Sequence, residues 1–124
     1  MVCSRQMAEN GEFSGAYCPK FQGAVELIGR RWTGAIVRAL LGGSVRFGDV
    51  LHQIPGLSDR LLSERLRELE AEGIVERTVF PEIPVRVEYH LTEKGRELQE
   101  IVMAVGDWAE KWAVEAPVGE AAGR

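Results

Sequence analysis

The segment Pro55–Leu91 changes from a helical to a strand periodicity without an intervening linker. In its first part, leucines recur at steps of three and four, at Leu62, Leu66 and Leu69. Such spacing predicts a helix over 58–72. Residues 85–91 alternate strictly between apolar and polar side chains, which predicts a strand that pairs with 74–80 across a proline-bracketed turn. A short helix followed at once by a β-hairpin restricts the chain to a small, mixed α+β arrangement.

The ends of this helix are well specified by local residues. Ser58 is the predicted N-cap, because its hydroxyl can accept from a free backbone amide of the first turn. Leu57 and Leu62 have the spacing of a hydrophobic staple. Gly73 and Ile74 match the last two positions of a Schellman stop. The polar outer face is therefore predicted to carry Asp59, Arg60, Ser63, Glu64, Arg67 and Glu68.

Three shorter helices are predicted before this one. The pair Cys18-Pro19 begins the first, because proline is favoured at the first helical position and makes Cys18 the N-cap. Thr33 is the predicted N-cap of the second, which Gly42-Gly43 ends. The third covers about 47–54 and ends at the Pro-Gly pair that follows.

A long last helix is predicted over 93–115, with Thr92 as its N-cap. Its apolar residues fall at steps of three and four: Leu98, Ile101, Val102, Val105, Trp108, Ala109 and Trp112. This stripe either closes the core or packs against a second copy, as in a two-fold dimer. We favour the dimer, because four other short helices leave little core to cover Trp108 and Trp112.

With 124 residues and 45% hydrophobic side chains, the chain can form one domain with a core. We predict a flexible tail over 1–17, a folded domain over 18–92, the added helix over 93–115 and a flexible tail over 116–124. No stretch reaches the ~18 consecutive apolar residues of a membrane span. The first residues lack the apolar region of a signal peptide, so we expect a cytoplasmic protein without a membrane partner.

Charge is distributed unevenly along the chain. The net charge of −4 taken alone argues against binding to nucleic acid. However, residues 30–67 hold seven arginines and three acids, whereas residues 68–124 hold six basic and thirteen acidic residues. Such asymmetry suggests that the basic segment contacts a polyanion, with chance clustering as the alternative.

Residues that typically carry enzymatic or metal chemistry do not occur in recognisable patterns. Cys3 and Cys18 are too few for a disulfide framework, and His52 and His90 are isolated. The sequence has no Gly-rich phosphate loop and no nucleophile–base pair at an informative spacing. We therefore expect no enzyme, no cofactor and no metal site.

Several short motifs occur in a consistent order: Cys18-Pro19, Ile28–Trp32, Arg46-Phe47, Ile54–Ser58, Leu66–Glu70, Pro84–Tyr89 and Leu91–Gly95. Through them the chain resembles the HxlR family of bacterial regulators, relatives of the MarR type, over about 18–112. It departs from the family at Arg31, where a lysine is typical, and the charge is kept. The resemblance implies an α+β, mostly helical fold: a winged helix-turn-helix domain with a two-stranded β-hairpin wing and an added C-terminal dimerisation helix. It also implies a DNA-binding transcriptional regulator, with repression as the expected mode.

On this interpretation the helix 58–72 enters the major groove of double-stranded DNA. Its first turns and the flanking elements then supply the predicted DNA contacts: Arg46, Ser58, Arg60, Ser63, Arg67 and Arg86. Arg60 and Ser63 are assigned to base edges or nearby phosphates, Arg86 to a phosphate or the minor groove, and the others to the backbone. Glu64 is expected to pair with an arginine of its own helix. Arg86 has an alternative role as a solvated strand residue paired with Glu82 or Glu88.

A homodimer implies a palindromic operator with half-sites one or two helical turns apart. The predicted dimer interface comprises Phe21, Leu98, Ile101, Val105, Trp108 and Trp112. Cys18 is the predicted sensor of oxidants or small electrophiles, because a helix N-terminus and the neighbouring Lys20 favour the thiolate. The alternative is a capping cysteine that only packs.

Two other functions remain open from the sequence. A winged helix can bind protein instead of DNA, which the acidic net charge favours and the arginines of 58–72 disfavour. A regulator can also respond to a ligand without thiol chemistry. Phe21, Trp32 and Tyr89 are the aromatic residues that could line a small pocket for such a ligand, although aromatics in such places are more often core.

Overall fold

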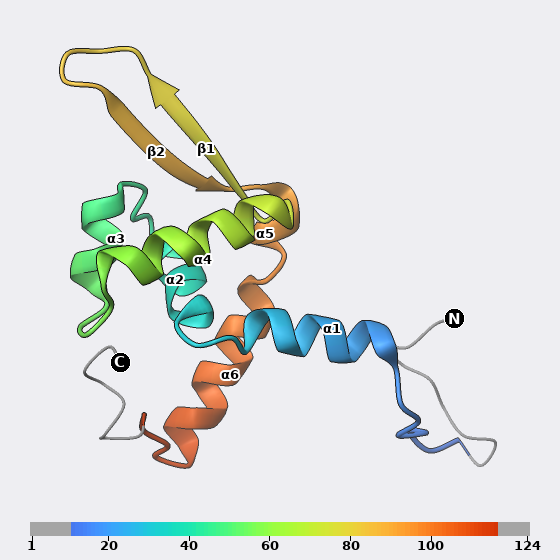
Figure 1. Ribbon diagram of the computed structural model, residues 1–124. Coiled ribbons are helices and arrows are strands. Elements are labelled where there is room, and N and C mark those ends of the chain that lie inside the picture. The colour runs from blue at the N-terminus through green and yellow to red at the C-terminus, as the bar shows by residue number, and fades with distance from the viewer. Residues whose placement is uncertain (1–10, 117–124) are drawn as a thin grey trace.

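The computed structural model describes residues 11–116. Figure 1 shows a helical body from which a β-hairpin projects at one end and the last helix at the other. The elements in chain order are α1 (Pro19–Ile28), α2 (Thr33–Leu41), α3 (Phe47–Gln53), α4 (Asp59–Ala71), β1 (Val75–Phe80), β2 (Arg86–Leu91), α5 (Glu93–Arg96) and α6 (Gln99–Lys111). The predicted α+β, mostly helical fold with a two-stranded wing is confirmed. The tails predicted at 1–17 and 116–124 fall largely outside the described residues, as does Cys3.

The core forms where α2, α3 and α4 meet the base of the hairpin. Its largest fully buried side chains are Ile36, Val37, Val50, Leu62, Leu66 and Leu69. These are the apolar positions at helical spacing, so burial of one stripe per helix places the opposite face of α4 in solvent. β1 and β2 pair antiparallel, with Arg77 opposite Tyr89 and Phe80 opposite Arg86.

The ends of α4 follow the prediction. The Ser58 hydroxyl accepts from the Leu61 amide at 3.1 Å. Gly73 adopts φ +75°, and the Ile74 amide donates to the Leu69 carbonyl at 2.9 Å, which is a Schellman stop. Further bonds reach this end from the segment after the hairpin. The Thr92 hydroxyl donates to the Gly73 carbonyl at 2.5 Å, and Lys94 Nζ donates to the Glu72 carbonyl at 2.7 Å.

The predicted start of α2 is wrong by one residue. Trp32 stands at the N-cap position with φ 77°, and Thr33 is the first helical residue. Thr33 is only 2% exposed, so its side chain packs inside the domain instead of capping the helix. The chain turns into α2 through the left-handed backbone of Trp32, which few residues other than glycine and asparagine adopt without strain.

The helix predicted over 93–115 consists of two consecutive helical stretches, and the second ends at Lys111. At the junction the Leu98 amide donates to the Gly95 carbonyl at 3.0 Å, a tighter bond than the i→i+4 pattern. Gly95 is buried, and a Cβ there would overlap the Ile74 carbonyl oxygen. The short α5 is therefore held against the end of α4 before α6 begins in a new direction.

Candidate nucleic-acid interface

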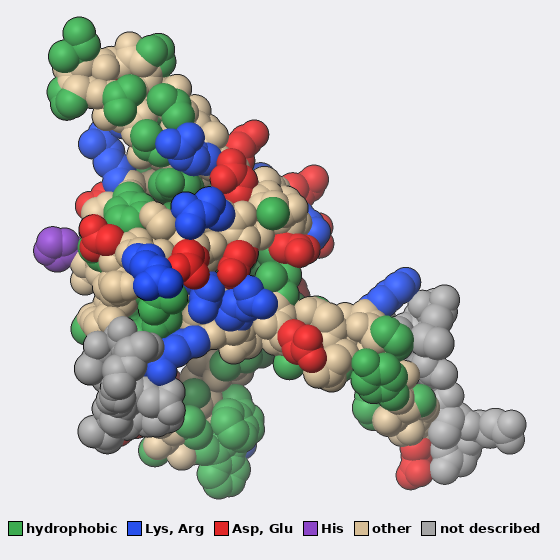
Figure 2. All heavy atoms as spheres, viewed as in Figure 1, with side chains coloured by type: hydrophobic (Ala, Val, Ile, Leu, Met, Phe, Trp, Pro, Cys, Tyr) green, Lys and Arg blue, Asp and Glu red, His purple; other side chains and the backbone are tan. Residues whose placement is uncertain are grey.

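Basic side chains gather on the face that carries α4. Figure 2 shows Lys and Arg side chains, interleaved with acidic ones, over the middle of the molecule and up to the base of the wing. The lower projection, formed by α6, presents mainly hydrophobic side chains in the same view. In this view the charged surface therefore lies over the middle of the molecule, and an apolar surface lies on the projecting α6.

The outer face of α4 holds the arginines predicted to meet DNA. The side chain of Arg60 is 89% exposed, and its Nε lies 3.1 Å from a carboxylate oxygen of Glu64. This confirms the predicted pairing of Glu64 within its own helix. Arg67 is exposed, and its guanidinium makes no ion pair with any residue in 11–116. Ser58 is exposed at the helix start, and Ser63 is half-buried one turn further along.

Arg46 occupies the N-cap position of α3 with an extended backbone, and its side chain is exposed. Its positive charge contributes to lowering the pKa of Glu82 in the wing. Arg46 therefore lies near the turn of the hairpin, although it forms no salt bridge within the described part of the chain. An exposed cation between the body and the wing is well placed for a phosphate.

Arg86 is held in an ion-pair network on one face of the wing. Its Nη2 lies 2.8 Å from Glu82, its Nη1 contacts Glu88, and its guanidinium stacks 3.8 Å from the centroid of the Phe80 ring. The hydrogen bond to Glu82 and then that to Glu88 raise the pKa of Arg86. The pKa of Glu82 is lowered mainly by its bond to Arg86, and that of Glu88 mainly by His90 and then by Arg86. Two carboxylates therefore neutralise this arginine, as its alternative role anticipated.

Arg77 is a wing cation that the sequence interpretation missed. It lies on β1 opposite Tyr89, is exposed, and makes no ion pair with another described residue. Because directly opposite residues share a face of the hairpin, Arg77 and Arg86 lie on opposite faces. A sequence signal for the role of Arg77 did exist. Glu82 and Glu88 are close in sequence to Arg86 and not to Arg77, which could have indicated that Arg77 is the wing cation without a nearby carboxylate of the turn.

Two other arginines serve the fold. Arg30 lies 2.8 Å from Glu68, and Arg65 lies 3.3 Å from the same carboxylate. Arg65 also donates from Nε to the backbone carbonyl of Arg31 at 3.0 Å. The three residues fasten the loop between α1 and α2 to the flank of α4, which fixes the orientation of that helix.

Cys18 caps α1, where its sulfur accepts from the Phe21 amide at 3.3 Å. The residue is 7% exposed. Its sulfur is disulfide-bonded in this structure, and the other cysteine of the chain, Cys3, lies outside the described residues. The predicted nucleophilic thiol therefore exists at this position only after reduction.

An apolar surface runs along α6 and reaches α1. No residue of α6 is buried, and the exposed fractions remain high at Phe21 (65%), Ile101 (47%), Val105 (62%), Trp108 (61%) and Trp112 (63%). Leu98 is partly buried against the core. Most of the stripe therefore does not close the core of the protomer. None of the helices between residues 11 and 116 is both long and apolar enough to cross a bilayer.

The pocket suggested for Phe21, Trp32 and Tyr89 does not form. Phe21 lines a groove beside α6, Trp32 lines a different hollow next to Ile54, and Tyr89 packs on the core from β2. The three aromatic rings are thus distributed over separate parts of the fold.

Comparisons with known proteins place the chain among helix-turn-helix transcriptional regulators. The family model for HxlR-like helix-turn-helix proteins matches residues 27–117. The chain is 50% identical over 95 residues to the HTH-type transcriptional regulator YvaP of Bacillus subtilis, covering 77% of this chain and 88% of YvaP. It is similar to the reduced form of YodB from B. subtilis, with 46% identity, a TM-score of 0.69 and coverage of 77% and 94% of the two chains. YodB has also been solved bound to quinone. The redox regulator HypR in its reduced form matches with 38% identity, a TM-score of 0.70 and coverage of 74% and 91%.

Proposed function

The chain belongs to the HxlR-like helix-turn-helix family and is a helix-turn-helix transcriptional regulator, and from that premise we propose that it acts as a homodimeric repressor on a palindromic operator. In this proposal α4 lies in the major groove, which is wide enough for a helix. Arg60 and Ser63 reach base edges, whereas Arg46, Ser58 and Arg67 contact the backbone. The wing lies beside the backbone, where Arg86 acts only once it leaves its carboxylate partners.

The observation that carries the proposal is the outer face of α4. A helix capped at both ends presents Arg67, which has no carboxylate partner among residues 11–116, and Arg60, whose side chain is 89% exposed. Glu64 neutralises Arg60 only through a solvent-exposed pair, which contributes about 0.5 kcal/mol and exchanges readily for a phosphate or a base. The acidic residues of the chain lie mostly beyond Arg67, so they do not dominate this surface.

The exposed stripe of α6 supports the homodimer. Large apolar residues that remain half exposed or more in the protomer mark an interaction surface. A two-fold axis next to α6 brings the same stripe of each copy together, because a C2 interface uses one patch twice. Phe21 lies at the edge of this stripe and extends the interface to α1.

Selection from randomised duplex DNA with the purified full chain tests the function directly. We expect enrichment of one sequence with two inverted half-sites, centred one or two helical turns apart. Enrichment of a single half-site would contradict the dimer, and absence of any enriched sequence would contradict sequence-specific binding. Arg67→Gln should bind the enriched duplex more weakly than the parent, and an unchanged circular dichroism spectrum would show that the variant is still folded.

We further propose that oxidation at Cys18 controls DNA binding. The cysteine caps α1, next to the proposed interface, so a bond at its sulfur changes how α1 meets the second copy. Two thiols lose two protons and two electrons to an oxidant such as diamide, which is reduced to the hydrazine as the disulfide forms. YodB and HypR support this proposal, because they have been solved in diamide-treated or oxidised forms as well as reduced ones.

Fluorescence anisotropy with labelled operator tests the thiol. Diamide should change the affinity of the parent by at least about tenfold, or ~1.4 kcal/mol, and dithiothreitol should reverse the change. Cys18→Ser should not respond, because it cannot form the disulfide. Cys3→Ser is the matched control for the second cysteine, and non-reducing electrophoresis of both variants identifies the cross-link. An unchanged diamide response of Cys18→Ser would rule out Cys18 as the sensor.

A further inference from the structure

The tip of the wing is apolar, although it projects into solvent. Figure 2 shows hydrophobic side chains gathered at the end of the hairpin, away from the helical body. Ile83 is fully exposed, and Val79 and Val85 are also exposed. Pro81 and Pro84 complete the group. Exposed apolar side chains that gather in one place mark an interaction surface.

The tip carries no net charge with which to bind a phosphate. Glu82 and Arg86 are the charged residues within 78–86, and they form the 2.8 Å ion pair of the wing. Glu88 contacts the same guanidinium. A neutral, apolar surface gains nothing from the phosphate backbone, so a DNA contact of the tip has to be made to sugars or bases.

Neither a second copy nor a large protein partner fits this tip. The stripe proposed for the homodimer lies on α6, and α6 and the wing project at opposite ends of the body (Figure 1). A stable protein interface takes about 800 Å² from each partner, whereas the tip offers only the side chains around one turn. The surface that adjoins the wing is the DNA-binding face proposed for α4, because only residues 72–74 separate α4 from β1.

The wing is long enough to pass the phosphate backbone. Each strand has six residues at about 3.3 Å per residue, which places the turn about 20 Å from the base of the hairpin. The major groove proposed to hold α4 is about 12 Å wide, and the neighbouring minor groove is about 6 Å wide. A hairpin of this length that starts beside α4 therefore reaches across one backbone to the adjacent minor groove.

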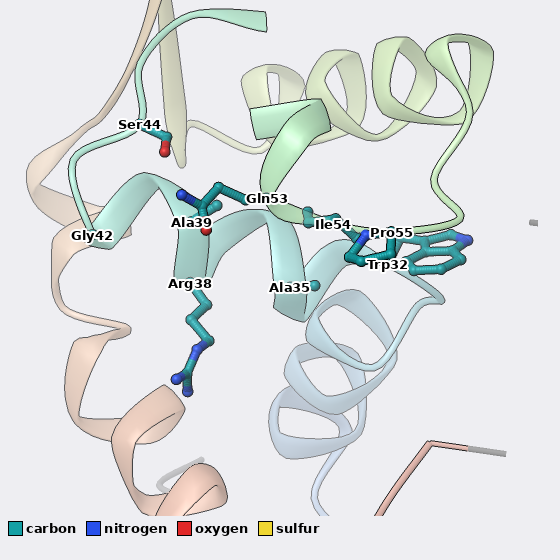
Figure 3. Close-up of a pocket in the computed structure, with 9 residues that line it drawn as sticks. All are labelled: Trp32, Ala35, Arg38, Ala39, Gly42, Ser44, Gln53, Ile54 and Pro55. Atoms are coloured by element: carbon teal, nitrogen blue, oxygen red, sulfur yellow. The ribbon is translucent and has the colours of Figure 1, made fainter. Parts of the chain in front are cut away.

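The base of the wing is fixed to the body. Val75 and Leu91, which pair at the start of the hairpin, are buried in the core. The segment after α2, which carries Ser44 in Figure 3, runs beside β2, where the Val45 carbonyl accepts from the Tyr89 amide at 2.7 Å. A hairpin held at its base by packing and by a backbone bond keeps its turn in place when the turn contacts DNA.

We propose that Ile83 and Pro84 form an apolar wedge, which enters the minor groove beside each half-site and unstacks one base step there. Isoleucine and proline are among the side chains that minor-groove proteins insert between base steps. The inference rests on the proposed binding of α4 to DNA and adds a contact that reads deformability. Pyrimidine–purine steps unstack most easily, so the wedge favours operators with such a step in each flank and disfavours stiff A-tracts.

2-Aminopurine, a base analogue whose fluorescence rises when it is unstacked, tests the wedge in the selected operator. The analogue is placed at successive flanking positions in separate duplexes, each bound by the full chain. We expect a rise of at least about threefold at one flanking step of each half-site. Ile83→Ser should return this signal to that of the free duplex, and it should remain folded because Ile83 is fully exposed. Ile83→Leu should keep the signal, because it keeps an apolar side chain of similar size.

Val79→Ser is the matched control, because it removes an exposed apolar side chain from the same wing but from strand β1 instead of the turn. It should leave the fluorescence rise unchanged. An equal loss of signal in Val79→Ser and Ile83→Ser would overturn the assignment of the wedge to the turn.

Replacement of the flanking step by an A-tract gives a second readout. The parent should bind the A-tract operator about tenfold more weakly than the selected one. Ile83→Ser should bind the two operators within about twofold of each other, because without the wedge no step has to be opened.

Anisotropy with the same duplexes separates failure of the wedge from failure of the proposed function. A parent chain that binds no duplex specifically would overturn both. A parent that binds the operator without a rise in flanking fluorescence would overturn the wedge alone. If Ile83→Ser matched the parent in fluorescence and in both affinities, the wedge would be refuted and the apolar tip would belong to a protein partner.

Discussion

Arg65 and Arg67 lie two positions apart on α4, and their guanidinium groups have different surroundings. The side chain of Arg65 is 14% exposed and bonds to the Arg31 carbonyl and to Glu68. Arg67 is exposed and has no ion-pair partner among the described residues. One arginine holds the fold together, whereas the other is available to a ligand.

Substitution of the two arginines should separate stability from DNA binding. Arg65→Gln should lower the free energy of unfolding by about 1–2 kcal/mol, because charged hydrogen bonds of low exposure are lost. Arg67→Gln should leave stability within about 0.5 kcal/mol. It should instead reduce the log–log salt dependence of operator binding by about 0.9, the value for one phosphate contact. Urea unfolding and anisotropy at several salt concentrations measure the two effects, and the reverse pattern would refute this division.

The sequence predicted these residues to different degrees. Ser58, Gly73 and the leucines of α4 could be placed because caps and helical periodicity are local. Arg86 was left with two possible roles: Glu82 and Glu88 are close to it in sequence, but only the strand register places Phe80 opposite it. The groove that Phe21 lines beside α6 could not be predicted either, because it requires α6 to pack next to α1 and α2, which are distant from it in sequence.

At the scale of the element, the wing has two faces of different charge. Arg86 is neutralised by Glu82 and Glu88, and Arg77 is uncommitted on the opposite face within the described chain. Replacing both carboxylates with glutamine should free Arg86 and steepen the salt dependence of operator binding by up to about 0.9. Glu76→Gln is the control, because this substitution removes a similar charge from the same face of the hairpin at a residue that does not contact Arg86. If Glu76→Gln steepened the salt dependence equally, the change would come from the net charge of the wing and not from the release of Arg86.

The ion pairs of the wing should also respond to pH. The pKa values of Glu82 and Glu88 are lowered in the folded chain, so their contribution to stability is present above the ordinary glutamate pKa. It is lost as the pH falls through the lowered values, because both carboxyls then become protonated. The melting temperature of the parent should exceed that of the Glu82→Gln/Glu88→Gln variant at pH 7, and the two should converge as the pH falls below the lowered pKa values. A difference that persists in acid would show that packing, not charge, causes it.

The junction between α4 and α5 depends on two glycines with different constraints. Gly73 has φ +75° and open space around a potential Cβ, so Gly73→Ala should destabilise by about 1 kcal/mol through backbone strain alone. Gly95→Ala should cost at least about 3 kcal/mol, because the new methyl group overlaps the Ile74 carbonyl. Thermal unfolding measures both changes, and equal losses would contradict the close packing of α5 on the end of α4.

At the scale of the whole molecule, charged side chains cover the middle of the face that carries α4, and α6 carries an apolar surface. Val105→Asp should shift the chain to a monomer and weaken operator binding, because each half-site then binds separately. Val105 is 62% exposed, so the protomer should remain folded. Met103→Asp is the control, because Met103 is exposed at 54% and lies on the far side of α6. Sedimentation velocity measures the oligomeric state of both variants. If Val105→Asp remained a dimer, the interface would not lie on this stripe.

The bonds from Thr92 and Lys94 to the last carbonyls of α4 have a consequence for how operators diverge. They join α4 rigidly to the segment that leads into α6, so in the proposed homodimer the crossing of two α6 helices sets the distance between two α4 helices. Substitutions along α6 would then alter the gap between half-sites and leave the base contacts of α4 intact. The base sequence of an operator would thus depend on α4 and the spacing of its half-sites on α6, and each could evolve without the other.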